Sequence, residues 1–289
     1  MQGLATLFGQ PDMAAPTVRY LQARQSPGGG FCFYRSAYLD EPNISDTYHA
    51  VRALHLLGAP PENSGQIAGF AKGFLESRHL LARSYAAWLL KCLAPSPPPG
   101  AQWLAEIARW PIPAPPGRSS PQLSAWLEQV RVAVRLKNAF AAGHDCSHVG
   151  PSLRALEHSA GGFGICPNLW DTWLALDILR GCEPGGSDLP ATRGFVERLQ
   201  VPVTGFALTE GSRSGNLDAL FAGLRCCRIL GIPVRFSSAI RSLLGACQTG
   251  RGGFARAPGA SPNIEYTYKA VWAFFCLVQY EQGIIHAEP

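Results

Sequence analysis

The sequence predicts an all-α fold of about six helix-pair repeats, each about 44 residues long, closed into a double ring of helices. Two recurring features predict it: a turn with a fixed spacing between Gln and Phe, and an Asn that stands five residues before an aromatic residue. The third observation is coverage, since six such units account for nearly the whole chain of 289 residues. Because one helix pair cannot bury its apolar face alone, we expect the repeats to pack into a single domain over residues 1–289.

Each clear repeat contains a turn that ends at a Phe. The segments Gln25–Phe31, Gln200–Phe206 and Gln248–Phe254 share one Gln-to-Phe spacing, and Glu157–Phe163 keeps it with Glu in place of Gln. The first and second of the four turns, counted along the chain, end at positions 31 and 163, and 163 − 31 = 132 residues is three units of 44. Two degenerate repeats therefore lie between them.

A helix precedes the turn in each repeat. Residues 14–25 form the first one by prediction, because Pro16 stands near its start and Val18 and Leu21 follow at helical spacing. Glycines at positions 28–30 end it. Two helices in each of six repeats give twelve helices, with the helices that precede the turns in one layer and the others in the second.

The second helix of each repeat follows the turn, and an Asn marks its start by capping the first backbone N–H groups. In the first repeat we expect a helix from Asn43 to Gly58, with Asp46 placed as in a capping box and Gly58 as the C-terminal stop. The clear caps and their aromatics are Asn43 with Tyr48, Asn168 with Trp173, Asn216 with Phe221, and Asn263 with Tyr268.

The second and third repeats, about residues 60–145, are degenerate. Tyr85 and Trp126 are placed at the starts of their second helices, since each begins an apolar helical run. Two proline-rich segments, residues 94–100 and 111–117, interrupt these repeats. Because proline cannot continue a helix, we expect both segments to be stiff surface connections.

Composition excludes several classes of protein. Hydrophobic residues make up 47% of the chain and charged residues 16%, which is typical of a chain that buries a sizeable core. A net charge of +5 without a basic run does not favour nucleic-acid binding. The N-terminus lacks a signal-peptide pattern, and no apolar stretch reaches the length of a membrane span. Nine cysteines, an odd number scattered through helices, favour reduced thiols and a cytoplasmic location.

The combined pattern of Gln-x5-Phe with Gly-Gly, then Asn-x3-Thr with Tyr or Trp opening an apolar helix, resembles the repeats of protein prenyltransferase β subunits and squalene-hopene-type cyclases. The likeness covers about residues 14–280 and is specific in four of the six units. It implies an α/α toroid, an α6/α6 barrel whose apolar, aromatic-lined central cavity holds an isoprenoid chain.

One aromatic side chain in each repeat is then a candidate substrate-binding residue. Rings at these positions offer flat apolar walls to a prenyl chain and negative faces that stabilise a carbocation. The alternative is that they pack between helices as ordinary core residues. The six candidates are Tyr48, Tyr85, Trp126, Trp173, Phe221 and Tyr268.

The catalytic residues of the related families carry over incompletely. Prenyltransferase β subunits bind zinc through Asp, Cys and His, and the repeats align Asp218 with the Asp but Leu220 with the Cys and Tyr266 with the His. One ligand of three cannot hold a catalytic zinc, so we expect no metal site of this type. The cyclases use an Asp-x-Asp-Asp run, which is absent, although Asp218 and Glu265 stand at the position of its catalytic acid. Both are candidate general acids or, alternatively, exposed helix-start carboxylates.

A diphosphate group would need cations near the cavity. Arg213 lies in the loop where β subunits place a diphosphate-binding arginine, although at a different spacing, and Arg225 and Lys269 lie on the adjoining helices. Simple surface solvation is the alternative for each. No cofactor is expected, apart from Mg²⁺ that could accompany a diphosphate substrate.

One cluster lies outside the resemblance. His144, Cys146 and His148 could bind a metal if their segment were helical. Gly143 before it and Gly150 after it favour a polar loop between repeats instead.

The leading functional hypothesis is a protein that binds an isoprenoid and acts, if it is an enzyme, as a prenyltransferase or terpene cyclase without the usual zinc. A non-catalytic scaffold on the same fold and an atypical class II-type cyclase with a single carboxylic acid are the alternatives. A protein partner or a second copy of the chain remains open, as do the substrate's chain length and the closure of the ring.

Overall fold

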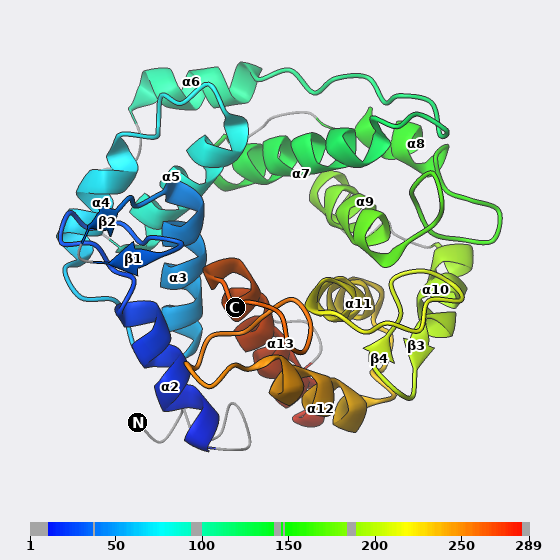
Figure 1. The fold of residues 1–289 in the computed structure, drawn as a ribbon. Helices are drawn as coiled ribbons and strands as arrows, with labels where there is room; N and C mark the ends of the chain where they lie inside the picture. Colours follow the sequence, from blue (N-terminus) through cyan, green and yellow to red (C-terminus); the bar gives the residue numbers. More distant parts are fainter. Residues whose placement is uncertain are drawn as a thin grey trace. The chain divides into compact units, whose positions relative to one another are not determined.

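The computed structural model describes residues 11–36, 38–93, 100–141, 146, 148–183 and 189–284. Twelve α-helices lie in these residues, the number that the sequence predicts (Figure 1). The chain divides into two compact units. The first unit comprises residues 1–98 and 241–289, and the second comprises residues 99–240. Among the described residues, no helix is long and apolar enough to cross a membrane.

The first unit joins the two ends of the chain. Its α13 lies beside α3 although more than 200 residues separate them in the sequence (Figure 1). Fully buried Leu54 and Trp272 contribute to its core from these two helices. Its elements are α2 (Pro11–Gln22), β1 (Arg35–Ser36), β2 (Leu39–Asp40), α3 (Ile44–Leu56), α4 (Ser64–Lys72), α5 (Leu80–Leu93), α13 (Ile264–Glu281) and most of α12 (Ser237–Cys247).

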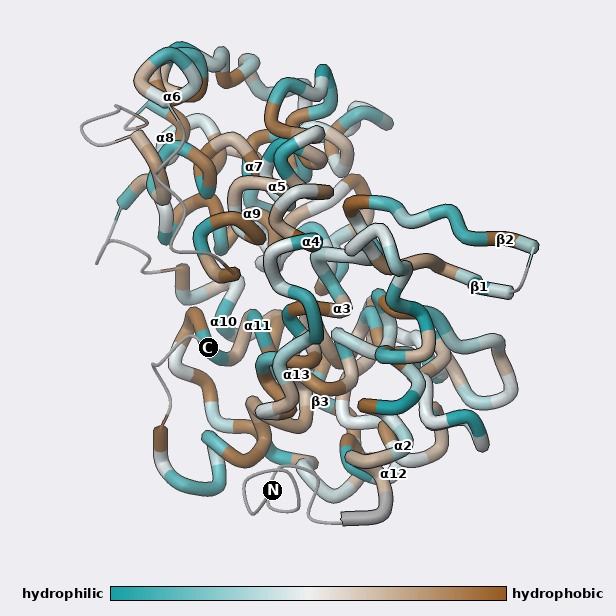
Figure 2. The backbone as a smooth tube through the Cα atoms, turned by 90° about the vertical axis from the view of Figure 1, so that its left-hand side faces the viewer, coloured by the Kyte–Doolittle hydropathy of each residue, from teal (hydrophilic) through white to brown (hydrophobic). Residues whose placement is uncertain are grey.

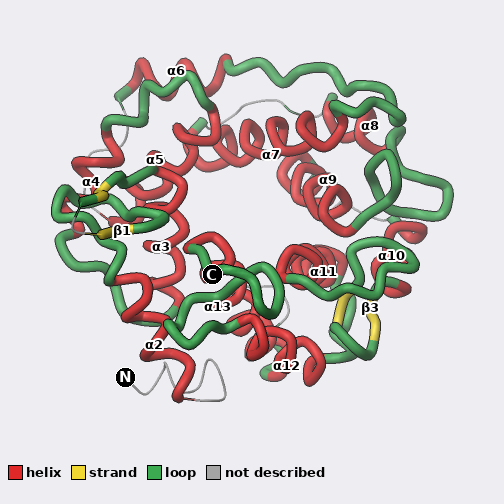
Figure 3. Tube along the Cα trace, in the orientation of Figure 1, coloured by secondary structure: helices red, strands yellow, loops and turns green. Residues whose placement is uncertain are grey.

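The second unit packs α9 between α7 and α11. Most of α9 is buried, including Leu174 and Ile178, because helices cover it on two sides. Long loops join its shorter helices (Figure 3). Its elements are α6 (Ala101–Arg109), α7 (Leu123–Phe140), α8 (Val149–Arg154), α9 (Leu169–Cys182), α10 (Pro190–Arg198), β3 (Gln200–Val201), β4 (Gly205–Phe206) and α11 (Leu217–Leu230).

The predicted caps are confirmed at all four clear repeats, and the structure explains the Thr that follows them. Asn43 has extended backbone geometry, and its side chain accepts a hydrogen bond from the Asp46 N–H at 2.8 Å. The Thr47 hydroxyl donates to the Asn43 carbonyl at 2.7 Å and accepts from the Phe31 N–H at 2.9 Å. Thr172 and Thr267 make the same pair of bonds in their repeats. In these three repeats the Thr therefore ties the turn to the helix that follows it, whereas Leu220 stands at this position after Asn216.

The fixed Gln-to-Phe spacing arises because the Gln and the Phe pair with each other across the turn. Gln25 pairs with Phe31, Gln200 with Phe206 and Gln248 with Phe254 as antiparallel partners across each turn. The Gln side chain then reaches the next repeat. The Gln25 amide donates to the Glu62 carbonyl at 2.7 Å, just before α4, and the Gln200 amide donates to the Pro233 carbonyl at 3.1 Å, before α12.

The last repeat makes this contact with the first one. The Gln248 amide donates to the Met13 carbonyl at 3.0 Å and to the Thr17 hydroxyl at 3.0 Å, both in α2. Thr17 also donates to the Gly252 carbonyl at 3.0 Å. Gly252 has a φ of +89°, and a Cβ there would overlap the Pro16 carbonyl. The sixth repeat therefore docks on the first as the first docks on the second.

Several predicted boundaries need correction. Helix α2 runs from Pro11 to Gln22 instead of 14–25, because Gln25 belongs to the paired turn. Helix α3 is shorter than Asn43–Gly58, since Asn43 is the cap and Gly58 takes a φ of +64° after the helix end. In the degenerate repeats no Asn cap fixes the start, so α5 and α7 begin five and three residues before their aromatics Tyr85 and Trp126.

Only one of the two proline-rich segments lies entirely within the described residues. Residues 111–117 lie between α6 and α7 without helical structure, as predicted for a connection. Most of residues 94–100 lies outside the described residues.

Candidate functional site

Three of the six candidate rings come together in the first unit. Tyr48 of α3 and Tyr85 of α5 stack with their ring centroids 4.2 Å apart and an interplanar angle of 21°. Trp88 packs edge-on against Tyr48 at 5.1 Å. The His49 ring contacts Tyr268 of α13, with the two ring centroids 5.4 Å apart, and so connects Tyr268 to this group. These side chains form the first aromatic cluster.

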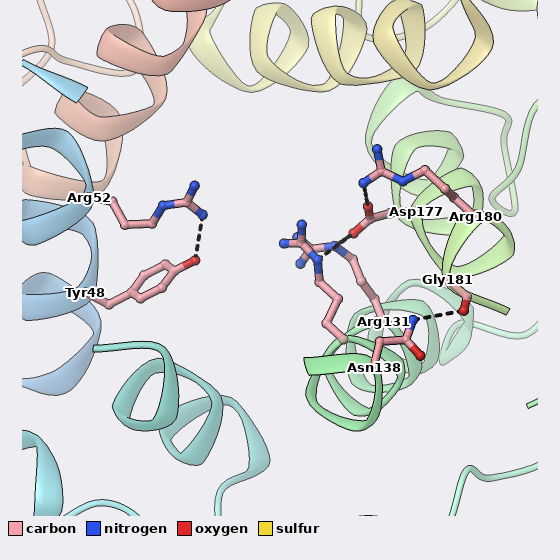
Figure 4. Close-up of polar contacts among 8 residues, drawn as sticks. Tyr48, Arg52, Arg131, Asn138, Asp177, Arg180 and Gly181 are labelled. Atoms are coloured by element: carbon pink, nitrogen blue, oxygen red, sulfur yellow. Dashed lines mark hydrogen bonds and ion pairs between the residues drawn. The ribbon is translucent and has the colours of Figure 1, made fainter. Parts of the chain in front are cut away.

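Arg52 lies one helical turn after Tyr48 and reaches the same rings. Its guanidinium carbon is 5.0 Å from the Trp88 ring centroid, 5.3 Å from that of Tyr268 and 5.8 Å from that of Tyr48. One guanidinium nitrogen donates to the Tyr48 hydroxyl at 3.1 Å (Figure 4). The first aromatic cluster therefore combines apolar ring faces with a cation.

His49 is buried within this cluster, with 8% of its surface exposed. Desolvation lowers the pKa of its imidazole to about 4; Glu265 opposes the shift, whereas Lys269 and Arg52 add to it. One ring nitrogen lies 2.9 Å from the Ser45 carbonyl. The histidine is thus neutral at pH 7 in the folded protein.

The His49 pKa predicts an acid-dependent loss of stability. Between pH 7 and pH 5 the unfolded chain takes up a proton that the folded protein excludes, so the free energy of unfolding should fall by about 2 kcal/mol. The loss begins near the unfolded pKa of 6.5 and ends near the folded value of about 4. Urea unfolding at the two pH values measures it, and His49→Gln should lack this part of the slope. Equal slopes in both proteins would contradict the assignment.

The second unit holds the second aromatic cluster. Trp173 of α9 and Phe221 of α11 meet edge to face, with ring centroids 5.3 Å apart, and Trp170 packs against Trp173 at 4.9 Å. Trp126 of α7 is also buried, but its indole N–H donates to the Pro113 carbonyl at 3.0 Å. Trp126 is thus held by the connection that precedes its helix.

A group of arginines surrounds one carboxylate beside this cluster. Asp177 of α9, with only 2% of its side chain exposed, accepts ion pairs from Arg131 at 2.7 Å, Arg135 at 3.2 Å and Arg180 at 2.9 Å. Figure 4 shows Arg131 and Arg180 converging on Asp177 from α7 and α9. We call these residues, together with Arg225 of α11, the arginine cluster.

The charges within the arginine cluster do not balance. Burial acts to raise the pKa of Asp177, but Arg135, Arg131 and Arg180, with a contribution from Arg225, hold it well below its usual range. Four guanidinium groups and one carboxylate sum to 4 − 1 = +3 for these five side chains. Several guanidinium groups gathered at a partly buried site favour an anion there.

Two of the arginines also contact the aromatic rings. The Arg131 guanidinium carbon is 4.4 Å from the Trp173 ring centroid, and that of Arg225 is 5.1 Å from the Phe221 ring centroid. Arg225 is buried, with 4% of its surface exposed. Apolar ring faces and cations are therefore contiguous in the second unit.

The repeat pattern does not point to Arg52, Arg131, Arg135 or Arg180, and it indicates Arg225 without its partners. A sequence pattern in three repeats could have indicated that rings and charges lie together, since residues four positions apart share a helix face. A charged residue stands four positions after the aromatic in Tyr48 with Arg52, Trp173 with Asp177, and Phe221 with Arg225.

The structure places the candidate acids and Arg213 at helix starts or loops. Asp218 is half-buried in the first turn of α11. Glu265 lies in the first turn of α13 with 44% of its side chain exposed and forms an ion pair with Lys269 at 2.7 Å. Arg213 is exposed in the loop before α11. The catalytic roles of Asp218 and Glu265 and the binding role of Arg213 stay predictions.

Two of the three residues that the repeats align with zinc ligands, Leu220 and Tyr266, offer no nitrogen or sulfur ligand for zinc. Leu220 is a fully buried hydrocarbon, and Tyr266 holds the Lys269 ammonium 4.9 Å from its ring centroid. Within the described ranges, no three His, Cys, Asp or Glu side chains gather to hold a metal ion. His144 of the polar cluster lies outside the described residues, whereas Cys146 is buried and His148 stands just before α8.

Comparisons with known proteins identify the fold. The family model of the prenyltransferase alpha-alpha toroid domain matches residues 1–91 and 124–287. A solved structure, Candida albicans protein geranylgeranyltransferase-I complexed with GGPP, aligns with a TM-score of 0.61 at 14% identity, covering 85% of this chain and 87% of that one. No curated protein matches the chain in a sequence search. The all-α toroid is thereby confirmed, and the chain belongs to the prenyltransferase alpha-alpha toroid domain family.

Proposed function

We propose that this protein binds a prenyl or polyprenyl diphosphate, with the diphosphate at the arginine cluster and the isoprenoid chain against Trp173 and Phe221. The observation that carries the proposal is the contact of Arg131 and Arg225 with these two rings. A ligand that matches such a surface has an anionic head joined directly to an apolar chain. Prenyl diphosphates have this construction.

The chemistry of the arginines supports a diphosphate head. A guanidinium presents a planar fork of N–H donors that matches phosphate oxygens, and it is less strongly hydrated than an ammonium group. Asp177 pairs with Arg131, Arg135 and Arg180 and so holds their guanidinium groups in place. A diphosphate would add negative charge beside these groups, and Mg²⁺ could accompany it.

The relatives support the ligand class. The family is named for prenyltransferases, and the geranylgeranyltransferase-I structure is a complex with GGPP. The first aromatic cluster offers a similar combination of Tyr48, Tyr85 and Tyr268 with Arg52. We propose these rings as substrate-binding residues of the first unit, and Trp126 as a further one of the second unit.

For catalysis, we infer that any reaction proceeds without the family's zinc ligands. Asp218 and Glu265 remain the proposed acids, although the exposure of Glu265 and its ion pair with Lys269 do not match an acid enclosed by apolar walls. The replacement of zinc ligands by Leu220 and Tyr266 favours a second candidate, a non-catalytic toroid that binds the ligand or a partner without converting it.

Calorimetry tests the binding proposal. Geranyl, farnesyl and geranylgeranyl diphosphates should each release heat on mixing, and the matching alcohols should bind more weakly because they lack the anionic head. Removing two arginines in Arg135→Ala with Arg180→Ala should weaken diphosphate binding by about 100-fold, at roughly 1.5 kcal/mol for each charge-assisted hydrogen bond.

Matched variants decide which arginines matter. Arg198→Ala removes an exposed arginine of the same unit that pairs with Glu210, and it should leave affinity unchanged. Arg52→Ala tests the first aromatic cluster separately. The proposal is wrong if no diphosphate binds, or if Arg198→Ala weakens binding as much as the double variant does.

A further inference from the structure

A second arginine-rich site lies on the first unit and is lined by residues that belong to neither aromatic cluster. It is a pocket of about 310 Å³ formed by α2, the segment that follows it and the turn of the sixth repeat. We call it the α2 pocket. Its polar lining consists of four arginines and two tyrosines: Arg19, Arg24, Arg35, Arg251, Tyr20 and Tyr34.

Backbone carbonyls hold two of these arginines without neutralising them. The Arg24 guanidinium stacks 3.6 Å from the Tyr20 ring centroid and donates to the Tyr20 carbonyl at 3.0 Å and the Phe33 carbonyl at 3.2 Å. Arg35 donates to the Gln25 carbonyl at 2.5 Å. A carbonyl fixes the position of a guanidinium but leaves its charge in place, so the cations are pre-positioned for an anion.

The acids beside the pocket compensate only part of this charge. Asp40 pairs with Arg35 at 3.3 Å, and the buried Asp46 interacts electrostatically with Arg24. Counting both carboxylates, the balance for these six side chains is 4 − 2 = +2. The α2 pocket therefore presents a net positive surface.

An exposed aromatic hairpin continues from the pocket. Eight large hydrophobic side chains are exposed in the described part of the chain, and half of them stand within residues 33–39. Tyr34 links the two features, because it lines the pocket while 55% of it is exposed. The strands β1 and β2 project from the helices of the unit (Figure 2). The exposed side chains are Phe33 at 57%, Tyr34 at 55%, Tyr38 at 100% and Leu39 at 39%.

We propose that this surface docks on an anionic lipid bilayer, with a lipid phosphate in the α2 pocket and the hairpin side chains in the headgroup region. Tyrosine favours this region because the region accepts both an apolar ring and a polar hydroxyl group, and phenylalanine adds an apolar ring that can enter the acyl boundary. Arginines placed next to them attract the anionic headgroups. The proposal is independent of the prenyl diphosphate site, since it uses other residues and another ligand.

Flotation with lipid vesicles tests the proposal on the full chain. Vesicles of phosphatidylcholine with phosphatidic acid should bind the protein, and vesicles of phosphatidylcholine alone should bind it far less. Arg19→Ala with Arg251→Ala should weaken binding about 30-fold, because each basic residue at an anionic surface contributes roughly a fivefold factor. Tyr38→Ser should weaken vesicle binding about tenfold, because it removes a ring that would be buried in the headgroup region.

The matched control is Arg109→Ala with Arg235→Ala. Both residues are exposed arginines of the second unit, so this variant has the same net charge as the pocket variant. It should bind as the wild type does. Equal losses in the two double variants, or equal binding to neutral and anionic vesicles, would overturn the proposal.

Soluble competitors separate the lipid from other anions. Glycerol 3-phosphate carries the phosphate without the bilayer, and polyglutamate stands in for an acidic protein partner. Neither should displace the protein from vesicles at concentrations close to that of the lipid. Displacement by glycerol 3-phosphate would reassign the pocket to a soluble phosphate ester, and displacement by polyglutamate would reassign the surface to a protein partner. Calorimetry distinguishes this proposal from the proposed function, because the double variant Arg19→Ala with Arg251→Ala should bind prenyl diphosphates as the wild type does.

Discussion

Asp177→Ala is expected to lower the free energy of unfolding by about 3–5 kcal/mol, because it leaves several guanidinium groups without their shared buried counter-charge. The carboxylate is 2% exposed and pairs with Arg131, Arg135 and Arg180. The depressed pKa of Asp177 also predicts that the folded protein becomes less stable in acid. The stabilisation is present above the unfolded pKa, near 3.8, and is lost as the pH falls below it. Urea unfolding monitored by circular dichroism measures both effects.

Two comparisons make this result specific. Glu210→Ala removes an exposed carboxylate that pairs with Arg198 in the same unit, and it should cost no more than about 1 kcal/mol. Added diphosphate should raise the unfolding temperature of Asp177→Asn more than that of the wild type, because an anion can replace the missing charge. If Asp177→Ala is no less stable than Glu210→Ala, the arginine cluster does not depend on this carboxylate.

Gly252→Ala should be comparably destabilising, by about 3–5 kcal/mol. Its φ of +89° is strained for a residue with a side chain, and its Cβ would overlap the Pro16 backbone of α2. Backbone strain and overpacking each cost roughly 1–3 kcal/mol. The thermal midpoint and the urea midpoint should both fall.

Two glycines of the same loop region separate these causes. Gly259 also has a positive φ, +81°, but open space surrounds the position of its Cβ, so Gly259→Ala should show the strain alone, about 1 kcal/mol. Gly250 has neither feature, and Gly250→Ala should have almost no effect. Three equal losses would mean that the close approach to α2 contributes nothing.

Much of the fold could be predicted because the repeat motifs act locally. Asn43 caps its own helix, Thr47 bonds across one turn, and Gln25 pairs with Phe31 at a fixed spacing. Such short-range constraints leave similar residues at the same intervals in the clear repeats, with Glu157 in place of Gln and Leu220 in place of Thr as exceptions. Where a cap is missing, as before Tyr85, nothing local fixed the helix start, and the predicted start was five residues late.

The candidate site was less predictable because its partners come from different helices. The ring positions follow from the repeats, so Trp173 and Phe221 could be named as candidates from the sequence. Asp177 and Arg131 are 46 residues apart, and no local pattern shows that α7 and α9 bring them within 2.7 Å. The hairpin aromatics were missed for a related reason, since only the structure shows that Tyr38 is fully exposed.

The hydrogen bonds from Gln248 to α2 also have a consequence for biosynthesis. They join residues 231 to 235 positions apart in the sequence, so their partner is absent until the ribosome has made most of the chain. The face of α2 that carries Met13 and Thr17 stays uncovered for that time. Contacts of such long range form slowly, and the nascent first repeat should be the segment that a chaperone protects.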